Sequence, residues 1–333
     1  MRASLFTSGP LGYCAAVRDR FVRFAWLVLG FNLAVILWGA YVRASGSGAG
    51  CGSHWPLCNG VVVPRAPTTA TLIELTHRVT SGLALLLVVG LFAWARQARP
   101  PGHPARTGAG FALGFMVGEA LLGAGLVLLA LVATDASVRR VIALALHLLN
   151  TFLLVASLGV TAYLAGQRPA PGGPGGPGRP GGRGWTTPWL LVPVLVGTLL
   201  IGVTGAMTAL GDTLFPARDL AAGLAQDQAP TAHFLLRLRV IHPALALLTS
   251  LYLAVAVGVL ATQPVASAVR RLARLALLLF VLQVGAGLTN LLLLAPVYMQ
   301  LLHLLLADCV WLALVLLTVA YGQAVGPVPA RRV

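Results

Sequence analysis

Charged residues are scarce in this 333-residue sequence, and one kind is missing altogether. They make up 9% of the chain, only eight residues are Asp or Glu, and all 23 basic residues are arginine because the sequence has no lysine. Charged residues account for about a quarter of a typical soluble protein. So few charges cannot cover a large surface in contact with water, which excludes a soluble globular protein.

Long apolar runs are present instead. Hydrophobic residues make up 58% of the chain, and its mean hydropathy is +0.88. A helix needs about 20 consecutive apolar residues to cross the hydrocarbon core of a membrane. The sequence therefore predicts an all-α integral membrane protein. The eight expected transmembrane helices cover roughly residues 22–42, 72–95, 109–132, 141–165, 188–210, 234–260, 272–294 and 296–321.

The arginines predict the orientation of these helices. Cytoplasmic segments of membrane proteins carry an excess of positive residues. If the N-terminus is cytoplasmic, fifteen of the 23 arginines fall on the cytoplasmic side. We therefore expect a multi-pass protein of the cell (plasma) membrane with both termini in the cytoplasm. The net charge of +15 is expected to attract anionic lipid of the bilayer and indicates no nucleic-acid partner.

One stretch separates the expected helices into two sets of four. Residues Pro169 to Gly184 are nearly all Gly, Pro and Arg, a composition typical of flexible linkers. The first twenty residues are mixed and basic, so no cleavable signal peptide is predicted. The expected segments are a cytoplasmic N-terminal segment (1–21), an N-terminal half (22–165), a cytoplasmic linker (166–187), a C-terminal half (188–322) and a cytoplasmic tail (323–333).

The two sets of helices resemble each other in sequence. Leu122-Gly123-Ala124-Gly125-Leu126 matches Val284-Gly285-Ala286-Gly287-Leu288, and His147-Leu148-Leu149 matches His303-Leu304-Leu305. Glycine pairs of this kind most often serve helix packing. Because four helices preserve the direction of the chain, we expect two tandem four-helix bundles related by a pseudo-two-fold axis along the membrane normal.

Each expected half contains one pair of histidines, His77 with His147 and His242 with His303. Histidine is costly in lipid, and at membrane depth it ligates metals, relays protons or bonds between helices. All four lie five to eight residues into a span that runs inward, on the order of 8 to 12 Å below the outer boundary. The shared depth predicts axial ligands of two haems towards the outer face, one haem in each half.

Haem propionates at the outer face would need cationic partners. Arginines lie near each histidine pair in the sequence, although an interfacial arginine often only extends its head group towards water. The candidate propionate contacts are Arg78, Arg139, Arg140, Arg237 and Arg239.

Three acidic residues fall within the expected helices: Glu74, Glu119 and Asp308. Glu74 lies three residues before His77 and therefore on the same helical face. A carboxylate there could orient the imidazole, accept a proton or stabilise positive charge near a macrocycle, and the alternative is a side chain that only faces water. The second half has Arg239 at this place, so the halves differ chemically. Glu119 and Asp308 are expected to make structural hydrogen bonds.

Two of the four cysteines lie close together in the first outer loop, where a disulfide can form and persist. Cys14 is expected in the cytoplasm and Cys309 inside a helix, so the expected disulfide joins Cys51 and Cys58. Such a bond could be a structural staple of the loop or a redox-active pair.

Three motifs together carry a family resemblance. The sequence reads Trp38-Gly39-Ala40-Tyr41-Val42-Arg43 at the end of the first helix, Trp55-Pro56-Leu57-Cys58 in the loop and Glu74-Leu75-Thr76-His77-Arg78 in the second helix. With eight helices and two histidine pairs, the chain resembles the haem A synthases, membrane enzymes that oxidise a methyl group of haem O to a formyl group. The resemblance extends from about Val22 to Tyr321.

The resemblance implies that the two halves have different tasks. It implies that His242 and His303 hold a haem b that passes electrons, whereas His77 and His147 mark the site where haem O becomes haem A. Glu74 corresponds to a carboxylate needed for activity. The resemblance also implies a haem O synthase as partner, an electron donor, and a haem-copper terminal oxidase as the destination of the product. A second cysteine pair of some members is missing, because residues 211–233 contain no cysteine.

Two other functions fit part of this pattern. A di-haem electron carrier of the cytochrome b kind, which oxidises a quinol, would use the same four histidines. A transporter would need interrupted helices and an ionisable residue near the middle of the bilayer, whereas the histidines lie towards one surface. The cysteine loop and Glu74 favour the synthase. His54, His103 and His233 lie in loops and are assigned no ligand role.

Overall fold

All the secondary-structure elements of the described part of the chain are helices, joined by loops. The computed structural model describes residues 10–167, 189–263 and 265–324. Its nine helices are α1 (Pro10–Ala44), α2 (Thr69–Ala98), α3 (Pro104–Leu128), α4 (Val138–Gly166), α5 (Val192–Leu214), α6 (Leu220–Gln228), α7 (Phe234–Thr262), α8 (Ser267–Leu292) and α9 (Val297–Ala324).

All of these helices except α6 are long and apolar enough to cross a membrane. The expected all-α membrane protein with eight spans is therefore confirmed. Helix α6 was not predicted, because its nine residues are too few and too polar to give a clear pattern. It begins where the Asp219 side chain accepts a hydrogen bond from the backbone N–H of Ala222, a common helix cap.

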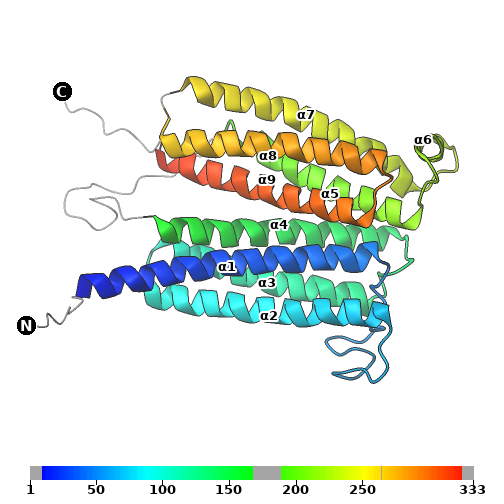
Figure 1. Ribbon diagram of the computed structural model, residues 1–333, viewed down its shortest axis with the longest axis horizontal. Coiled ribbons are helices and arrows are strands. Elements are labelled where there is room, and N and C mark those ends of the chain that lie inside the picture. The colour runs from blue at the N-terminus through cyan, green and yellow to red at the C-terminus, as the bar shows by residue number, and fades with distance from the viewer. Residues whose placement is uncertain (1–9, 168–188, 264, 325–333) are drawn as a thin grey trace, which may run out of the picture.

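The helices form two groups that lie side by side. Helices α1 to α4 contact one another, as do α5, α7, α8 and α9. Figure 1 shows the first group below and the second above, with α4 against α5 and α9 at the boundary between them. Each contacting pair of the first group has a counterpart in the second, such as α1 with α2 and α5 with α7. The pseudo-two-fold axis itself stays a prediction, and most of the expected linker and tail lies outside the described residues.

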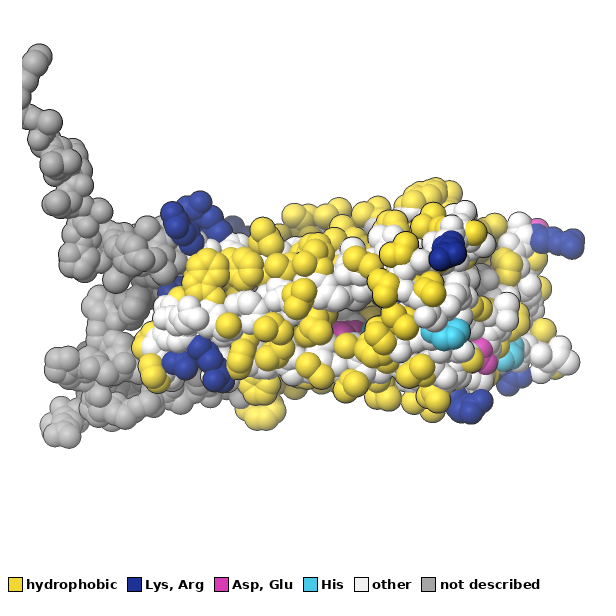
Figure 2. All heavy atoms as spheres, turned by 90° about the horizontal axis from the view of Figure 1, so that it is seen from below, with side chains coloured by type: hydrophobic (Ala, Val, Ile, Leu, Met, Phe, Trp, Pro, Cys, Tyr) yellow, Lys and Arg dark blue, Asp and Glu magenta, His cyan; other side chains and the backbone are white. Residues whose placement is uncertain are grey.

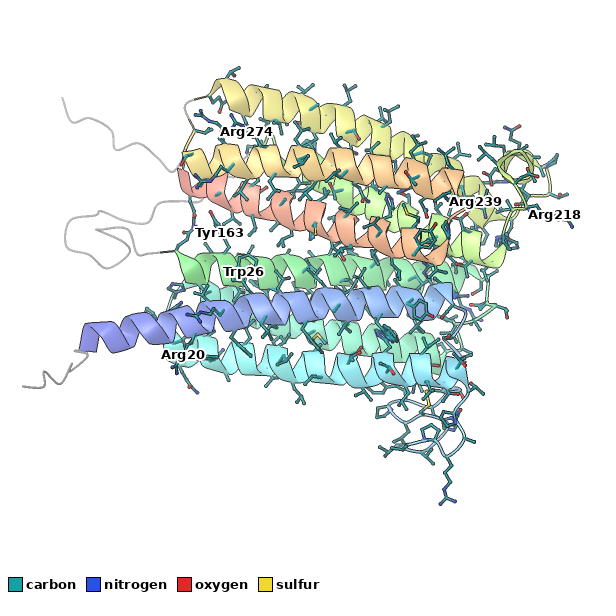
Figure 3. All side chains as sticks on the ribbon, in the orientation of Figure 1. Arg20, Trp26, Tyr163, Arg218, Arg239 and Arg274 are labelled. Carbon is teal, nitrogen blue, oxygen red and sulfur yellow. A yellow bond between two sulfur atoms is a disulfide. The ribbon has the colours of Figure 1, made fainter. Side chains whose placement is uncertain are left out.

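The two ends of the bundle differ. Helix α1 begins and α9 ends at one end, which we call the linker end, whereas the loop of residues 45–68 and helix α6 lie at the other, the loop end (Figure 1). Figure 3 shows Arg20 and Arg274 at the linker end and Arg218 and Arg239 at the loop end. Figure 2 shows hydrophobic side chains over the middle of one face, with arginines near both ends. This distribution is what an apolar membrane interior requires.

Each group has a buried apolar core, and one tryptophan joins the two. Trp311 of α9 is 4% exposed and belongs to the core of the first group. Its indole N–H donates to the carbonyl oxygen of Phe152 on α4 at 2.7 Å, and the two rings lie 5.5 Å apart between centroids. Because an unpartnered indole N–H is costly in an apolar interior, this bond fixes the register of α9 against α4.

Gly202 is expected to be essential for the packing of α5 against α4. A methyl group at this position would overlap the ring of Phe152, which is 1% exposed and already packed against Trp311. We expect Gly202→Ala to destabilise the protein by about 1–3 kcal/mol, the usual cost of overpacking a core. The measurement is the midpoint of thermal unfolding in detergent.

Gly258→Ala is the matched control. A methyl group at Gly258 would meet no other atom within 4 Å. Since alanine is favoured over glycine in a helix by about 1 kcal/mol, its unfolding midpoint should stay unchanged or rise slightly. Equal midpoints for the two variants would contradict the role given to Gly202.

Candidate functional site

The four histidines of the spans lie at a similar depth near the loop end. They belong to α2, α4, α7 and α9, and each follows the first residue of its helix by six to nine positions. These four helices all run from the loop end to the linker end (Figure 1). On the face that Figure 2 shows, the visible histidine side chains lie towards the loop end. The structure therefore brings each histidine to the same part of the bundle.

Three of the four imidazole rings pack directly against a glycine of a neighbouring helix. A methyl group built on Gly39 of α1 would lie 2.8 Å from Cε1 of His77, and one on Gly205 of α5 would lie 2.9 Å from Cε1 of His242. Gly39 and Gly205 thus make the same contact in the two groups of helices.

The third contact involves one of the repeated glycine motifs. A methyl group on Gly287 of α8 would lie 2.8 Å from Cε1 of His303. The other three glycines of these motifs, Gly123, Gly125 and Gly285, have open space at the position of a Cβ atom. Of the four motif glycines, only Gly287 packs against a neighbouring helix, where it makes room for the ring of His303.

His242 and His303 face each other in the second group of helices. Their ring centroids are 6.3 Å apart, and the rings are nearly perpendicular at 85°. Nδ1 of His242 lies 3.2 Å from the carbonyl oxygen of Ile201, which leaves its Nε2 available. Nε2 of His303 lies 3.3 Å from Nε2 of Gln283, a contact that His303 would give up in order to bind a metal through that nitrogen.

His77 and His147 have different surroundings in the first group. The buried Nδ1 of His77 has no hydrogen-bond partner among the described residues. Nδ1 of His147 lies 2.9 Å from Oε2 of Glu119 on α3, which is the distance of a charge-assisted contact, although the N–H direction is not yet that of a good hydrogen bond. The side-chain amide of Asn150 donates to Oε1 of the same carboxylate at 3.0 Å.

The hydrogen bonds of Glu74 go to the loop of residues 45–68 and to Arg78, and none goes to the ring of His77. Its Oε2 accepts a hydrogen bond of 2.8 Å from the backbone N–H of Cys51, and Oε1 accepts bonds from the guanidinium of Arg78. The remaining N–H groups of Arg78 reach the carbonyl oxygens of His54 and Leu57. Glu74 is only 3% exposed, so one buried carboxylate and one arginine tie the loop to α2.

The disulfide between Cys51 and Cys58 is present, as expected from the sequence, with an S–S distance of 1.99 Å. Both cysteines are fully buried. The backbone N–H of Cys51 binds Glu74, so the disulfide is adjacent to this carboxylate. Glu74 itself lies one helical turn before His77. Cys309 is a free cysteine of α9.

Four of the five candidate propionate arginines already have partners. Arg78 is described above, Arg140 donates to the carbonyl oxygens of Ala133 and Asp135, and Arg237 donates to that of Pro230. Arg139 is exposed. Propionate contact stays a prediction for each of them.

Arg239 binds two carboxylates and one carbonyl oxygen. It pairs with Asp212 at 2.9 Å and Asp227 at 3.4 Å, and donates to the carbonyl oxygen of Phe215 at 3.0 Å. Figure 3 shows it at the loop end, near helix α6. Desolvation raises the pKa of Asp227 in α6, and the charge of Arg239 opposes that rise. Arg239 thus fastens α6 to α7 and α5.

Sequence reasoning missed two contacts of the site. The first is the pairing of Glu119 with His147. An acidic residue in a span indicates that a partner exists, but the sequence does not identify that partner. The second is Arg43 of α1, whose guanidinium donates to the carbonyl oxygen of Ala209, to Thr213 and to Gln300 in the other group of helices. The expectation of a structural hydrogen bond is confirmed for Glu119. For Asp308, which is 1% exposed, it is wrong, because neither oxygen has a partner among the described residues.

The spacing of His242 and His303 fits a haem held by two histidines in the second half. Imidazole nitrogens bind metal ions at about 2 Å, so two rings on opposite sides of one ion have centroids about 6 Å apart, close to the spacing of His242 and His303. Nδ1 of His77 and Nδ1 of His303 have no hydrogen-bond partner among the described residues, whereas Nε2 of His303 contacts Gln283. No cluster of three or more His, Cys, Asp or Glu residues suited to a metal ion occurs in the described ranges, and a site with two axial histidines needs none.

Comparison with known families decides the family. The COX15-CtaA family, described as cytochrome oxidase assembly proteins, matches residues 22–315. The chain belongs to the COX15-CtaA family. The resemblance to the haem A synthases, stated above from the motifs, is thereby confirmed at the level of the family.

Two kinds of relatives are similar to this COX15-CtaA protein. Proteins from two strains of Thermus thermophilus are 49% identical over 299 residues, which is 90% of this chain and 48% of theirs, and each is named Protoheme IX farnesyltransferase. A protein of Bacillus mycoides named Heme A synthase is 40% identical over 110 residues, 33% of this chain and 35% of its own. The chain spans about half the length of the Thermus relatives and a smaller share of the Bacillus one.

Arg78 is expected to shield the disulfide from reductants. It binds two carbonyl oxygens of the loop with a charged donor, each bond worth about 1.5–3 kcal/mol. We expect Arg78→Gln to raise the rate at which dithiothreitol reduces the bond between Cys51 and Cys58 by about tenfold, measured by labelling of new thiols over time.

Arg65→Gln provides the comparison, because Arg65 is an exposed arginine of the same loop. Its rate of reduction should equal that of the unaltered protein. If both variants are reduced at that rate, the loop does not depend on Arg78.

Proposed function

We propose that this protein is a haem A synthase, an oxidoreductase that converts a methyl group of haem O into the formyl group of haem A. The observation that carries the proposal is the difference between the two histidine pairs. Only His77 lies one helical turn from a buried carboxylate that is bonded to a disulfide loop. In the second half the corresponding residue is Arg239, which forms ion pairs with Asp212 and Asp227.

We assign the second half to electron transfer. His242 and His303 would hold a resident haem b through their ring nitrogens, with Gly205 and Gly287 providing the space beside the rings. When bound, that haem accepts electrons one at a time and passes them on. The protein's own contribution is to hold both imidazoles in place and to surround them with the apolar core.

We assign the first half to the substrate. His77 and His147 would bind the iron of haem O, with the ring of His77 pressed against Gly39. The conversion removes four electrons in two steps. In the first, the methyl group and one water give an alcohol, two protons and two electrons, and the electrons must pass to an acceptor outside the protein. In the second, the alcohol and another water give a hydrate with the same release, and the hydrate loses water to form the aldehyde.

These steps release four protons, which need a route out of an apolar site. Glu74 is the acidic group closest in sequence to His77, and its bonds to Arg78 and Cys51 connect it to the loop at the membrane surface. We propose that Glu74 helps to carry these protons and stabilises positive charge that develops near the substrate. Its place between helix and loop suits a group that exchanges protons with the outside.

We place the histidines towards the outer face of the cell membrane and both termini in the cytoplasm. The arginines at the linker end, such as Arg20 and Arg274, support this orientation by the positive-inside rule (Figure 3). The proposed halves are residues 22–165 for the substrate and 188–322 for haem b.

The relatives suggest where the substrate comes from. The Thermus proteins are named Protoheme IX farnesyltransferase, and the region similar to this chain makes up 48% of their length. Farnesylation of protohaem gives haem O, the substrate proposed here. We propose that an enzyme with this activity is the partner of the protein, and that haem A is delivered to a haem-copper terminal oxidase.

Expression in a host that makes haem O but no haem A tests the function. We expect membranes containing the protein to yield haem A or its hydroxylated intermediate, identified by mass after extraction. His77→Ala should abolish both products and leave the haem b content unchanged, because His77 belongs only to the proposed substrate half.

The rival function, a di-haem electron carrier, predicts another result. It predicts haem b alone in a folded protein that has a competent electron supply. It also predicts that His77→Ala lowers the haem b content, because His77 would then be a ligand of haem b.

Glu74→Gln tests the proton role separately. Removal of a positioned acid or base typically lowers a rate by about 100-fold or more. We expect haem A formation to fall by about 100-fold while haem O stays bound. Since Glu74 also holds the loop, the disulfide is checked in the same preparation by thiol labelling. Full conversion with Gln at this position would end the proposed role of Glu74.

A further inference from the structure

One contact near the candidate ligands is not used by the function proposed so far. Glu119 of α3 places Oε2 at 2.9 Å from Nδ1 of His147 on α4. Its other oxygen accepts a hydrogen bond from Asn150, one helical turn after His147. The amide of Asn150 also donates to the carbonyl oxygen of Phe115 on α3, so Asn150 is itself fixed against α3.

The close fit of α3 against α4 supports this arrangement. A methyl group on Gly118 would lie 2.7 Å from the side-chain oxygen of Asn150. Glycine at this position therefore lets Asn150 reach across to α3 and hold Glu119. The side chain of Glu119 is 14% exposed and that of His147 is 28% exposed, so the pair lies largely out of contact with water.

Within the described ranges, none of the other three histidines has an anionic partner. Nδ1 of His77 and Nδ1 of His303 have no hydrogen-bond partner among the described residues, and Nδ1 of His242 contacts the carbonyl oxygen of Ile201. In the aligned glycine motifs, the residue that corresponds to Glu119 is Val281, which carries no charge. The carboxylate thus distinguishes one histidine of the first half from its counterpart in the second.

We propose that Glu119 is a positioning residue, which holds His147 with Nδ1–H towards its carboxylate and Nε2 towards the iron of the substrate haem. This inference rests on the proposed function, because it takes His147 to be a ligand of that iron. A carboxylate on the far nitrogen fixes the tautomer and orientation of an imidazole and makes it a stronger donor. Binding of Nε2 to iron would fix the ring and align Nδ1–H with Glu119.

A stronger donor favours the more positive oxidation state of the metal. The pair of His147 and Glu119 therefore stabilises ferric over ferrous iron in the first half only. The two haems of the protein would then differ in reduction potential, with the lower potential in the half that contains Glu119. Electrons would pass from the substrate half to the other half in the energetically favourable direction.

Spectroelectrochemical titration of the purified full-length protein, with both haems bound, tests this proposal. The haem of the first half is the one whose signal is lost in His77→Ala. In Glu119→Gln, we expect the ratio of ferric to ferrous affinity at this haem to fall about tenfold, which raises its midpoint potential by about 59 mV for a one-electron couple. The midpoint of the other haem should not change.

Two further variants separate this effect from simple alternatives. Glutamine keeps the size of Glu119 and an oxygen for Asn150, so a purely structural role predicts no shift in Glu119→Gln. Asp308→Asn removes another buried carboxyl group of the spans, which has no hydrogen-bond partner among the described residues, and should leave the potential of the first haem unchanged. Glu119→Asp keeps the charge and should recover part of the original potential.

The outcomes distinguish this inference from the proposed function. An unchanged or lower midpoint in Glu119→Gln, or an equal shift of both haems, overturns the role of Glu119, whereas haem A formation by the unaltered protein would still establish the synthase. A shift confined to the first haem, in a protein that never forms haem A, supports the pair and overturns the function.

Discussion

A polar side chain inside a membrane-spanning helix needs a partner within the protein, because lipid offers none. This constraint organises the whole bundle. Trp311 satisfies its indole on the backbone of α4, and the amide of Asn32, 3% exposed, donates to a carbonyl of its own helix at Val28. The histidines follow the same rule in another way: three rings lie against glycines, which give them room without offering a bond. Nδ1 of His77 and Nδ1 of His303 have no hydrogen-bond partner among the described residues.

The same constraint makes the halves unequal. Both contain a histidine pair at one depth and a glycine beside α2 or α7. The first half adds two carboxylates: the buried Glu74, which binds the disulfide loop, and the half-buried Glu119, which lies beside Nδ1 of His147. The second half uses its acids differently, because Asp212 and Asp227 neutralise Arg239. The two halves thus differ in the acidic groups near their histidines, although the second half also contains the buried Asp308.

The sequence predicted those features that depend on composition along one helix. Eight apolar stretches gave the spans, and the compartment of the cysteines gave the disulfide between Cys51 and Cys58. Features that depend on how two helices face each other could not be predicted from the sequence. The face shared by Glu74 and His77 suggested a direct contact, yet Glu74 turns to the loop because Cys51 and Arg78 supply its donors. The partner of Glu119 and the short helix α6 likewise follow from tertiary packing.

Arg43 makes the two groups of helices unequal at the place where they meet. Its guanidinium donates at 2.8 Å to the carbonyl oxygen of Ala209, the residue that occupies the same place in the second half, four positions after the glycine that contacts a histidine. If both halves carried arginine there, two cations would meet in an apolar interface, where like charges repel strongly. A symmetric dimer of two first halves is therefore disfavoured.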